Sequence, residues 1–174
     1  LLRLENEAMS AALRQSLSES EQKAATDPLT GQANRRAFEA ALAQQQAATA
    51  ATGAGYALLM LDIDHFKSIN DRFGHDVGDL ALKAFAARVA VQLRGIDLLA
   101  RIGGEEFMVL LRGATHDAAT LVAQRICSAV AAQPLLHEPQ LPVTVSVGVA
   151  LHRPGASSDE VIKAADRAVY QAKH

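Results

Sequence analysis

Hydrophobic positions along the chain follow two periods, and each period predicts a different element. The apolar run 56–61 is continuous and ends at Asp62, which is typical of a central strand buried on both faces. Residues 143–151 alternate between Val and smaller or polar residues, which predicts another strand. Two further apolar segments, 97–102 and 106–111, flank Gly103-Gly104 and predict an antiparallel hairpin.

Elsewhere the apolar positions recur at three- and four-residue spacings, which predicts helices. We expect helices at 1–25, 34–48, 66–73, 115–132 and 157–173, and one that follows a turn at 74–79 and runs to about residue 93. Thr115 is suited to cap one of them and Ser157 or Ser158 the last, and 49–55 is expected to be a loop. The order after residue 50 predicts an α/β (α+β) fold, an antiparallel sheet with helices packed on it.

Composition narrows the class of protein. The chain has 174 residues, 49% of them hydrophobic, which is enough for one domain with a buried core. A net charge of −2 argues against a dedicated nucleic-acid-binding protein, because such proteins carry a basic surplus. A single cysteine, Cys127, excludes a disulfide framework and predicts a buried thiol on a helix. No apolar run approaches the ~18 residues of a membrane helix, so we expect a cytoplasmic fragment without membrane contact.

Residues 1–25 predict a helix with only a weak apolar stripe. The stripe consists of Leu2, Met9, Leu13 and Leu17. It fits either the end of a coiled-coil stalk or a plain surface helix. Pro28 and Gly31 interrupt the helical pattern, so we place a boundary between 1–25 and the domain 26–174. Because the chain starts at Leu1 rather than Met, we expect a fragment of a longer protein, with a sensor, a receiver or a membrane anchor upstream and a short tail trimmed downstream.

Four acidic residues fall where a buried strand or a hairpin turn ends. Asp62 and Asp64 follow the continuous apolar run, and Glu105 and Glu106 follow the paired glycines. A carboxylate at the end of a buried strand costs desolvation energy unless it is paired or binds a cation. Hard oxygen ligands suit Mg²⁺ or Mn²⁺, which combines a few carboxylates with substrate phosphates. The acids therefore predict metal-assisted phosphoryl transfer, although each acid alone also fits a solvated strand end.

Short motifs recur in a fixed order along 26–173. They are Asp27-Pro28-Leu29-Thr30-Gly31 with Asn34-Arg35-Arg36, Asp62-Ile63-Asp64-His65-Phe66-Lys67 with Ile69-Asn70-Asp71, Phe73-Gly74-His75 with Gly78-Asp79, Arg101-Ile102-Gly103-Gly104-Glu105-Glu106-Phe107, Ser146-Val147-Gly148-Val149-Ala150, and Ala165-Asp166 with Tyr170-Gln171-Ala172-Lys173. Their order and spacing resemble the GGDEF family of diguanylate cyclases, with the signature in its Gly-Gly-Glu-Glu-Phe variant. The resemblance implies a central, mainly antiparallel five-stranded sheet flanked by helices, like nucleotide cyclase and polymerase palm folds, with a helix in front.

The resemblance also implies a reaction, which joins two GTP molecules into cyclic di-GMP and releases two pyrophosphates. It makes Asp62 and Glu105 the carboxylate ligands of Mg²⁺ or Mn²⁺, helped by the backbone carbonyl of Ile63. The metal would polarise the α-phosphate and lower the pKa of the attacking ribose 3′-hydroxyl. Glu105 is further expected to assist deprotonation of that hydroxyl, and Glu106 to support the site as the second signature acid.

Other positions match GTP-binding residues of the family. Asn70 and Asp79 would read guanine, because a carboxylate can accept both adjacent N–H donors that adenine lacks. The positions expected near the triphosphate are Lys67, Arg167 and the backbone N–H groups of His65 and Phe66. Gly103 and Gly104 would leave room for a base or a phosphate, or form no more than a tight turn. Gln171 stands where the family often has a second basic residue, which predicts weaker triphosphate binding.

Two GTP molecules must be joined head to tail, although each domain holds one. We therefore expect a homodimer with two-fold symmetry, which helix 1–25 would orient if it forms a coiled coil. Arg94-Gly95-Ile96-Asp97 is spaced like the inhibitory RxxD site of the family for cyclic di-GMP, or forms a surface ion pair. In the inhibitory interpretation Arg94 would hold a phosphate or guanine, Asp97 would accept from guanine, and Arg125 would be a secondary contact.

Three other interpretations compete with catalysis of this reaction. The first is a catalytically silent receptor module for cyclic di-GMP or GTP, the second a synthase of mixed cyclic dinucleotides, and the third a structural dimerisation domain. The intact acids Asp62, Glu105 and Glu106 favour catalysis over the first and third. Asp79 favours GTP over a mixed pair of substrates. Members of the family are typically bacterial, and the resemblance implies the same for this chain.

Overall fold

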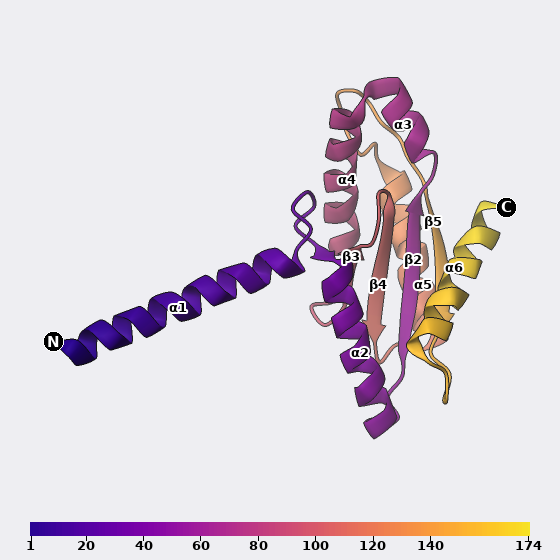
Figure 1. Ribbon diagram of the computed structural model, residues 1–174. Helices are drawn as coiled ribbons and strands as arrows, with labels where there is room; N and C mark the ends of the chain where they lie inside the picture. Colours follow the sequence, from indigo (N-terminus) through magenta and orange to yellow (C-terminus); the bar gives the residue numbers. More distant parts are fainter.

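A five-stranded sheet in the order β1-β3-β4-β2-β5 forms the centre of the computed structural model, which describes residues 1–174 (Figure 1). The strands are β1 (Ala33–Asn34), β2 (Tyr56–Ile63), β3 (Leu98–Arg101), β4 (Glu106–Arg112) and β5 (Val145–Leu151). The helices are α1 (Leu2–Ala25), α2 (Arg35–Thr52), α3 (Phe66–Phe73), α4 (His75–Ala90), α5 (His116–Ala132) and α6 (Ser158–Lys173). Only β1 and β3 pair in parallel, so the predicted mainly antiparallel sheet is confirmed.

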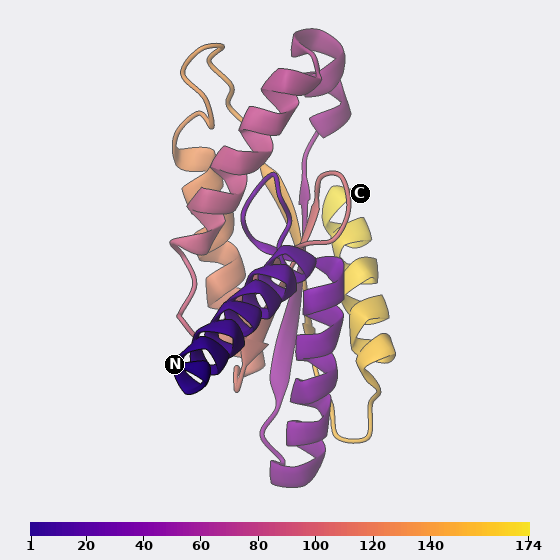
Figure 2. The ribbon, with the colours of Figure 1, turned by 60° about the vertical axis from the view of Figure 1, so that its left-hand side comes forward.

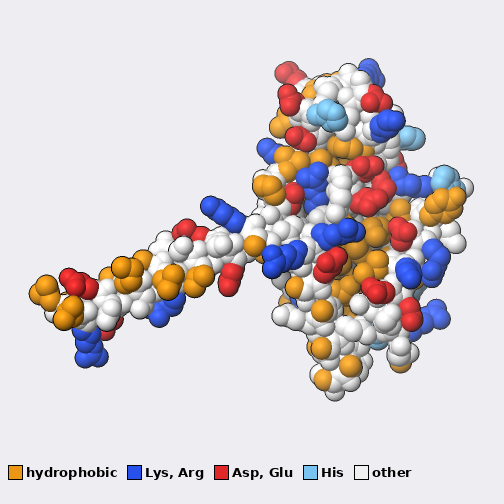
Figure 3. Space-filling model, in the orientation of Figure 1, with side chains coloured by type: hydrophobic (Ala, Val, Ile, Leu, Met, Phe, Trp, Pro, Cys, Tyr) orange, Lys and Arg blue, Asp and Glu red, His pale blue; other side chains and the backbone are white.

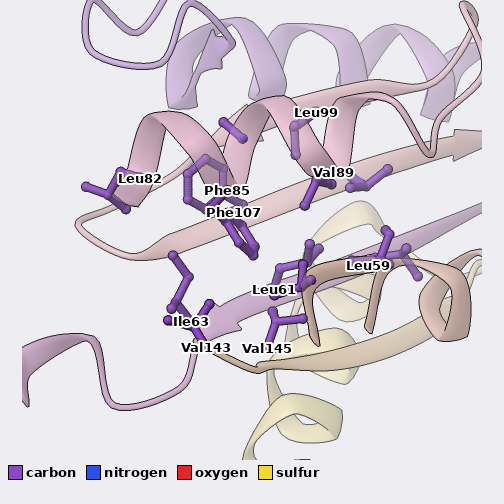
Figure 4. Packing of buried hydrophobic residues seen from close by; sticks show 14 of the residues in the cluster. Leu59, Leu61, Ile63, Leu82, Phe85, Val89, Leu99, Phe107, Val143 and Val145 are labelled. Atoms are coloured by element: carbon purple, nitrogen blue, oxygen red, sulfur yellow. The ribbon is translucent and has the colours of Figure 1, made fainter. Parts of the chain in front are cut away.

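Helices cover both faces of this sheet, which explains the continuous apolar run in β2. Leu59 and Leu61 point to the cluster formed with α3, α4 and α5, where the rings of Phe85 and Phe107 lie 5.0 Å apart (Figure 4). Leu58 and Met60 point to the opposite cluster beneath α2 and α6, which lie side by side (Figure 2). Alternate residues of β2 are buried on opposite faces of the sheet. Both sets must therefore be apolar, and no polar residue occurs in the strand before Asp62.

Helix α6 packs directly on β5, and one glycine makes that approach possible. A β-carbon at Gly148 would collide with the carbonyl of Ala165 and the amide of Val169, and would lie 2.8 Å from Cγ2 of Val169. Burial of Val161, Ala165 and Val169 holds the helix against the sheet. The C-terminal turn of α6 is thereby carried to the same end of the sheet as the β3–β4 hairpin (Figures 1 and 2).

Helix α1 projects away from the sheet and buries none of its residues (Figure 1). Its large apolar side chains are therefore exposed along its length (Figure 3); they are Leu1, Leu2, Leu4, Met9, Leu13 and Leu17. The helix is tied to the domain at its end, where Nδ2 of Asn34 donates to the carbonyl of Ala24 at 2.9 Å. No helix of the chain combines the length and the apolar character that crossing a membrane requires.

The structure corrects several predicted boundaries. Strand β1 was not predicted, because its two residues carry no pattern. The loop expected at 49–55 begins only at Gly53, since α2 continues through Thr52. The turn expected at 74–79 is confined to Gly74, which adopts φ +88° and is followed at once by α4. Thr115 caps α5 as predicted by accepting from the amide of Ala118. Of the two serines predicted as caps of α6, Ser157 is the cap, and it accepts from the amide of Glu160.

Candidate active site

The sheet register brings the predicted acids to one end of the central strand. Asp62 lies opposite Glu106 of β4 on one side and opposite Ser146 of β5 on the other. The amide of Ile63 donates to the carbonyl of Glu105 at 3.5 Å, which ties the signature hairpin to the end of β2. Acidic side chains gather at this level, with basic side chains beside them (Figure 3). The strand-end acid Asp62 and the hairpin acids Glu105 and Glu106 therefore lie at the same end of the sheet.

Lys173, for which no role was predicted, contacts the two aspartates at the end of β2. Its Nζ is 3.1 Å from Oδ1 of Asp62 and 3.5 Å from Oδ1 of Asp64. Asp64 also accepts hydrogen bonds from the hydroxyls of Thr144 at 2.6 Å and Ser146 at 2.7 Å. Burial alone would raise the pKa of Asp64, but these hydrogen bonds and the Lys173 charge outweigh it and lower the pKa. Asp64 therefore stays ionised and fixes Lys173.

If GTP is the substrate, as the resemblance implies, and Lys173 binds its phosphates, replacing Lys173 by methionine is expected to raise KM for GTP by about tenfold to a hundredfold, because a hydrogen bond from a charged donor contributes about 1.5–3 kcal/mol. The methionine retains the stem of the side chain and loses the ammonium group. Steady-state kinetics with GTP measures the effect. Lys83→Met, at an exposed position of α4, is the matched control. An unchanged KM for Lys173→Met would show that the ammonium group does not contact the substrate.

Glu106 carries negative charge that the surrounding protein does not offset. Burial is the largest cause that raises its pKa, and the charges of Asp62, Glu105 and Asp166 add to it, against a smaller opposing effect of Arg35. The folded chain therefore binds a proton at Glu106 more tightly than the unfolded chain does. Stability from this group is complete below the ordinary pKa of glutamate and is lost as pH rises through the raised pKa.

Glu106→Gln is consequently expected to raise the free energy of unfolding at neutral pH, because the neutral amide avoids the burial and repulsion that raise the pKa of the Glu106 carboxyl. The advantage should shrink towards about pH 3, below the ordinary pKa of glutamate, where the group is protonated in both folded and unfolded chains. Urea denaturation of both proteins at the two pH values measures it. Glu21→Gln, an exposed change on α1, is expected to show no such pH-dependent difference. Equal stability of Glu106→Gln and wild type at neutral pH would contradict the repulsion.

The start of α3 offers free backbone donors beside the acids. His65 precedes this helix in a left-handed conformation, with φ +57°, and its side chain forms no capping hydrogen bond. The amides of the first turn, which begins at Phe66, are therefore not satisfied by a cap and suit a phosphate. Lys67 lies exposed in the same turn. These predicted triphosphate contacts thus occupy one short segment next to Asp64.

A second polar feature lies between α3 and α4. Oδ1 of Asn70 is buried and has no hydrogen-bond partner, which is costly unless a ligand supplies a donor. It rests against Gly78, where a β-carbon would collide with that oxygen. Asp79, exposed on α4, is the next residue. The two predicted guanine-reading residues therefore lie at one helix–helix junction, and one of them presents an unpaired acceptor.

The hairpin tip is open, and an ion pair holds it. Neither Gly103 nor Gly104 has a left-handed φ, and a β-carbon at Gly104 would meet no atom within 4 Å. The backbone turn does not require glycine here, and no side chain occupies the space above the tip. Arg101 donates to the carbonyl of Gly104 at 3.1 Å and to Oδ1 of Asp27 at 3.3 Å. This links the signature hairpin to the turn that follows α1.

Arg167 does not join this group. It lines a cavity beside β5 together with His116 and Arg153, whereas Lys173 reaches the carboxylates. Helix geometry separates the two basic residues, because six positions at 100° each place them on different sides of α6. The basic residue that α6 brings to the acids is thus Lys173.

Comparison with known proteins agrees with this geometry. Residues 24–174 match the model of the family described as diguanylate cyclase, GGDEF domain. The chain belongs to the GGDEF family of diguanylate cyclases. It is 41% identical over 163 residues to diguanylate cyclase DgcP of Pseudomonas aeruginosa, covering 93% of this chain and 24% of that protein. It is 42% identical over 165 residues to response regulator PleD of Caulobacter vibrioides, covering 92% of this chain and 36% of that protein.

A solved GGDEF structure matches nearly the whole chain. The coiled coil and GGDEF domain of DgcB from Caulobacter crescentus, in complex with c-di-GMP, superimposes with a TM-score of 0.91 at 31% identity. The match covers 97% of this chain and 91% of that one. The predicted fold class is thereby confirmed. The chain spans about a quarter to a third of the length of the two curated relatives.

The residues predicted to form the inhibitory site of a GGDEF domain also lie near one another. Asp97, 1% exposed, accepts from Nη2 of Arg94 at 2.9 Å and from its backbone amide at 2.8 Å. Arg94, 54% exposed, also donates to the carbonyl of Arg112 at 3.1 Å. Arg125 donates to the carbonyl of Gln92, two residues before Arg94. The carboxylate of Asp97 is thus occupied in holding Arg94, and the guanidinium is the exposed partner.

The GGDEF family implies a divalent cation, and the donor set of this chain fits one. No three His, Cys, Asp or Glu side chains are gathered closely enough to hold a metal ion by themselves. Mg²⁺ does not require such a cage, since it combines one or two carboxylates with substrate phosphates and water. Asp62 and Glu105 both repel the Glu106 carboxylate, and a bound cation would relieve that repulsion.

Proposed function

We propose that this chain condenses two GTP molecules into cyclic di-GMP with release of two pyrophosphates. One observation carries the proposal. The end of β2 brings Asp62 together with the signature acids and with Lys173, beside an uncapped helix start and an unpaired Asn70 acceptor. A triphosphate needs the cationic and amide donors, and guanine needs the acceptor. A nucleotide bound by both would place its ribose and α-phosphate at the acids.

Each group of the chain has a role in this arrangement. Lys173 and the first-turn amides of α3 bind the triphosphate, and Lys67 adds positive charge nearby. Asn70 and Asp79 accept the N1–H and N2–H donors of guanine, so ATP is rejected because its base would leave these acceptors unpaired. Gly103 and Gly104 leave space for the substrate of the facing domain.

Asp62, Glu105 and the carbonyl of Ile63 are the groups that would hold Mg²⁺ or Mn²⁺. When bound, the ion supplies polarisation of the α-phosphate and a lower pKa of the 3′-hydroxyl. The 3′-oxygen forms a bond to the α-phosphorus of the other GTP, and the bond from that phosphorus to pyrophosphate breaks. Glu105 accepts the hydroxyl proton, and Glu106 maintains the negative field around it. The 3′-hydroxyl of the second GTP attacks the α-phosphorus of the first in the same way, which closes the ring and releases the second pyrophosphate.

This chemistry requires two domains that face each other with two-fold symmetry, because each holds a single GTP. We infer that residues 1–25 form the regulatory helix of domain 26–174 and pair in a coiled coil. Two observations support this: the apolar side chains of α1 are exposed, and the matching DgcB structure comprises a coiled coil and a GGDEF domain. The link from Asp27 through Arg101 to Gly104 would transmit the position of α1 to the hairpin.

Incubation of the purified chain with GTP and Mg²⁺, followed by mass spectrometry, tests the proposed reaction. We expect cyclic di-GMP and pyrophosphate from GTP, and no cyclic dinucleotide from ATP. A parallel incubation with GTP and ATP together excludes a mixed product. Formation of GDP or of a linear dinucleotide as the end product would overturn the assignment.

We further propose that cyclic di-GMP inhibits the enzyme by binding the exposed Arg94. Arg94→Ala is expected to raise the product concentration for half-inhibition by at least about tenfold, which corresponds to the loss of one charge-assisted contact. Initial rates at increasing cyclic di-GMP measure the shift. Arg36→Ala, an exposed change on α2, should leave inhibition unchanged. Unaltered inhibition in Arg94→Ala would assign the product to another site.

A further inference from the structure

The outer edge of β5 borders a cavity of about 630 Å³. Val149, Ala150 and Leu151 all line it. Val149 and Leu151 pack toward the cluster under α5, whereas Ala150 packs toward the cluster under α6. A cavity that reaches side chains from both faces of a strand must surround the edge of that strand. Because β5 pairs only with β2, its outward backbone N–H and C=O groups face this space.

Positive charge dominates the rim of this cavity. The ionisable residues that line it are His116, Arg153, Lys163, Arg167 and Glu160. None of them takes part in any ion pair of the protein. Basic side chains are visible over α6 on this side of the molecule (Figure 3). The strand edge therefore lies beside Lys163 and Arg167 of α6, Arg153 of the loop that follows β5, and His116 at the start of α5, in a protein whose net charge is −2.

The sequence of β5 does nothing to block pairing along this edge. The strand has seven residues, Val-Ser-Val-Gly-Val-Ala-Leu, with no proline and no charge. Protected edges are usually short, as β1 is with two residues, or carry lysine, proline or a bulge. A long apolar edge with a basic rim is thus suited to a strand whose own side chains are acidic.

We propose that the β5 edge binds an extended acidic segment of a partner protein, which adds to the sheet as a sixth strand. Main-chain hydrogen bonds to β5 would supply affinity, and acidic side chains would pair with the basic residues Arg153, Lys163 and Arg167 of the cavity rim. Lys163 also borders a smaller cavity that contains Glu106, whereas His116, Arg153 and Arg167 line only the cavity at the β5 edge. Binding of a segment at this edge does not depend on the proposed cyclase reaction.

A fluorescein-labelled octapeptide of alternating glutamate and valine tests the proposal by fluorescence anisotropy. We expect saturable binding, and at least about a tenfold rise in Kd for the double variant Lys163→Glu with Arg167→Glu. Lys83→Glu, an exposed change on α4, is the matched control and should bind as the wild type does. Circular dichroism of the double variant verifies that it folds. Backbone amide shifts on titration should be largest at residues 147–151.

A peptide of the same sequence with N-methylated backbone amides separates strand addition from simple charge attraction. It retains the acidic side chains and loses the donors, so we expect it to bind at least about tenfold more weakly. Equal binding of the two peptides, or amide shifts away from β5, would overturn the proposal. So would a homodimer that requires Lys163 and Arg167, because the edge would then belong to a second copy of the chain.

Discussion

Asp62→Asn is expected to lower the rate of cyclic di-GMP formation by at least about 1000-fold, which corresponds to about 4 kcal/mol of lost transition-state stabilisation. Asp62 stands at the end of the buried central strand, opposite Glu106 and 3.1 Å from Lys173. Asparagine keeps the size of the side chain and removes the charge that would hold the cation. The fold should be retained, because the side chain lies at the strand end and outside both apolar clusters.

Product formation from GTP, quantified by liquid chromatography, measures the change. Asp117→Asn, an exposed change in the first turn of α5, is the matched control and should remain within about twofold of the wild type, since exposed substitutions alter stability by no more than about 0.5 kcal/mol. Equal urea midpoints of Asp62→Asn and wild type would show that lost folding is not the cause. A rate for Asp62→Asn within tenfold of the wild type would place the essential carboxylate elsewhere.

Gly148→Ala is expected to destabilise the protein by about 3 kcal/mol, at the upper end of the range for overpacked cores. The added methyl group would meet the backbone of Ala165 and Val169, which cannot move away as the end of a flexible side chain could. Relief requires α6 to move off β5. The same shift would withdraw Lys173 from Asp62, so KM for GTP should rise together with the loss of stability.

Urea denaturation measures the loss, and Gly55→Ala provides the control. Gly55 has an ordinary φ, and a β-carbon there would meet nothing within 4 Å. Gly55→Ala should leave stability unchanged or raise it by up to about 1 kcal/mol through the unfolded chain. A stability of Gly148→Ala within 1 kcal/mol of the wild type would mean that α6 is not seated on β5 as the structure has it.

Local patterns in the sequence predicted much of the sheet and the acidic part of the site. The apolar run before Asp62 and the Gly103-Gly104 turn are signals that depend only on a few neighbouring residues. The central strand and the hairpin could therefore be predicted from the sequence. Strand β1 could not be predicted in the same way. Its two residues form a strand only because folding brings Ala33 beside Ala100, which is far away in the sequence.

The basic part of the site was predicted less well, and for a reason that helix geometry explains. Val161, Ala165 and Val169 are buried at a spacing of four, and Lys173 continues that row toward the sheet. Arg167 lies two residues off the row, which directs it to the edge of β5. The spacing of the apolar residues in α6 therefore already indicated which side of the helix faces the sheet. The ion pair from Asp27 to Arg101 had no comparable signal, since it joins residues far apart along the chain.

The central claim is that two GTP-loaded domains meet to make one product. Its most direct measurement is the rate of cyclic di-GMP formation per protein molecule, with GTP and Mg²⁺ in excess, at increasing protein concentration. The account predicts that this rate rises with concentration until dimers predominate and that Glu105→Gln forms no product at any concentration. A rate per molecule that is constant down to concentrations at which sedimentation shows only monomers, or full activity of Glu105→Gln, would contradict it.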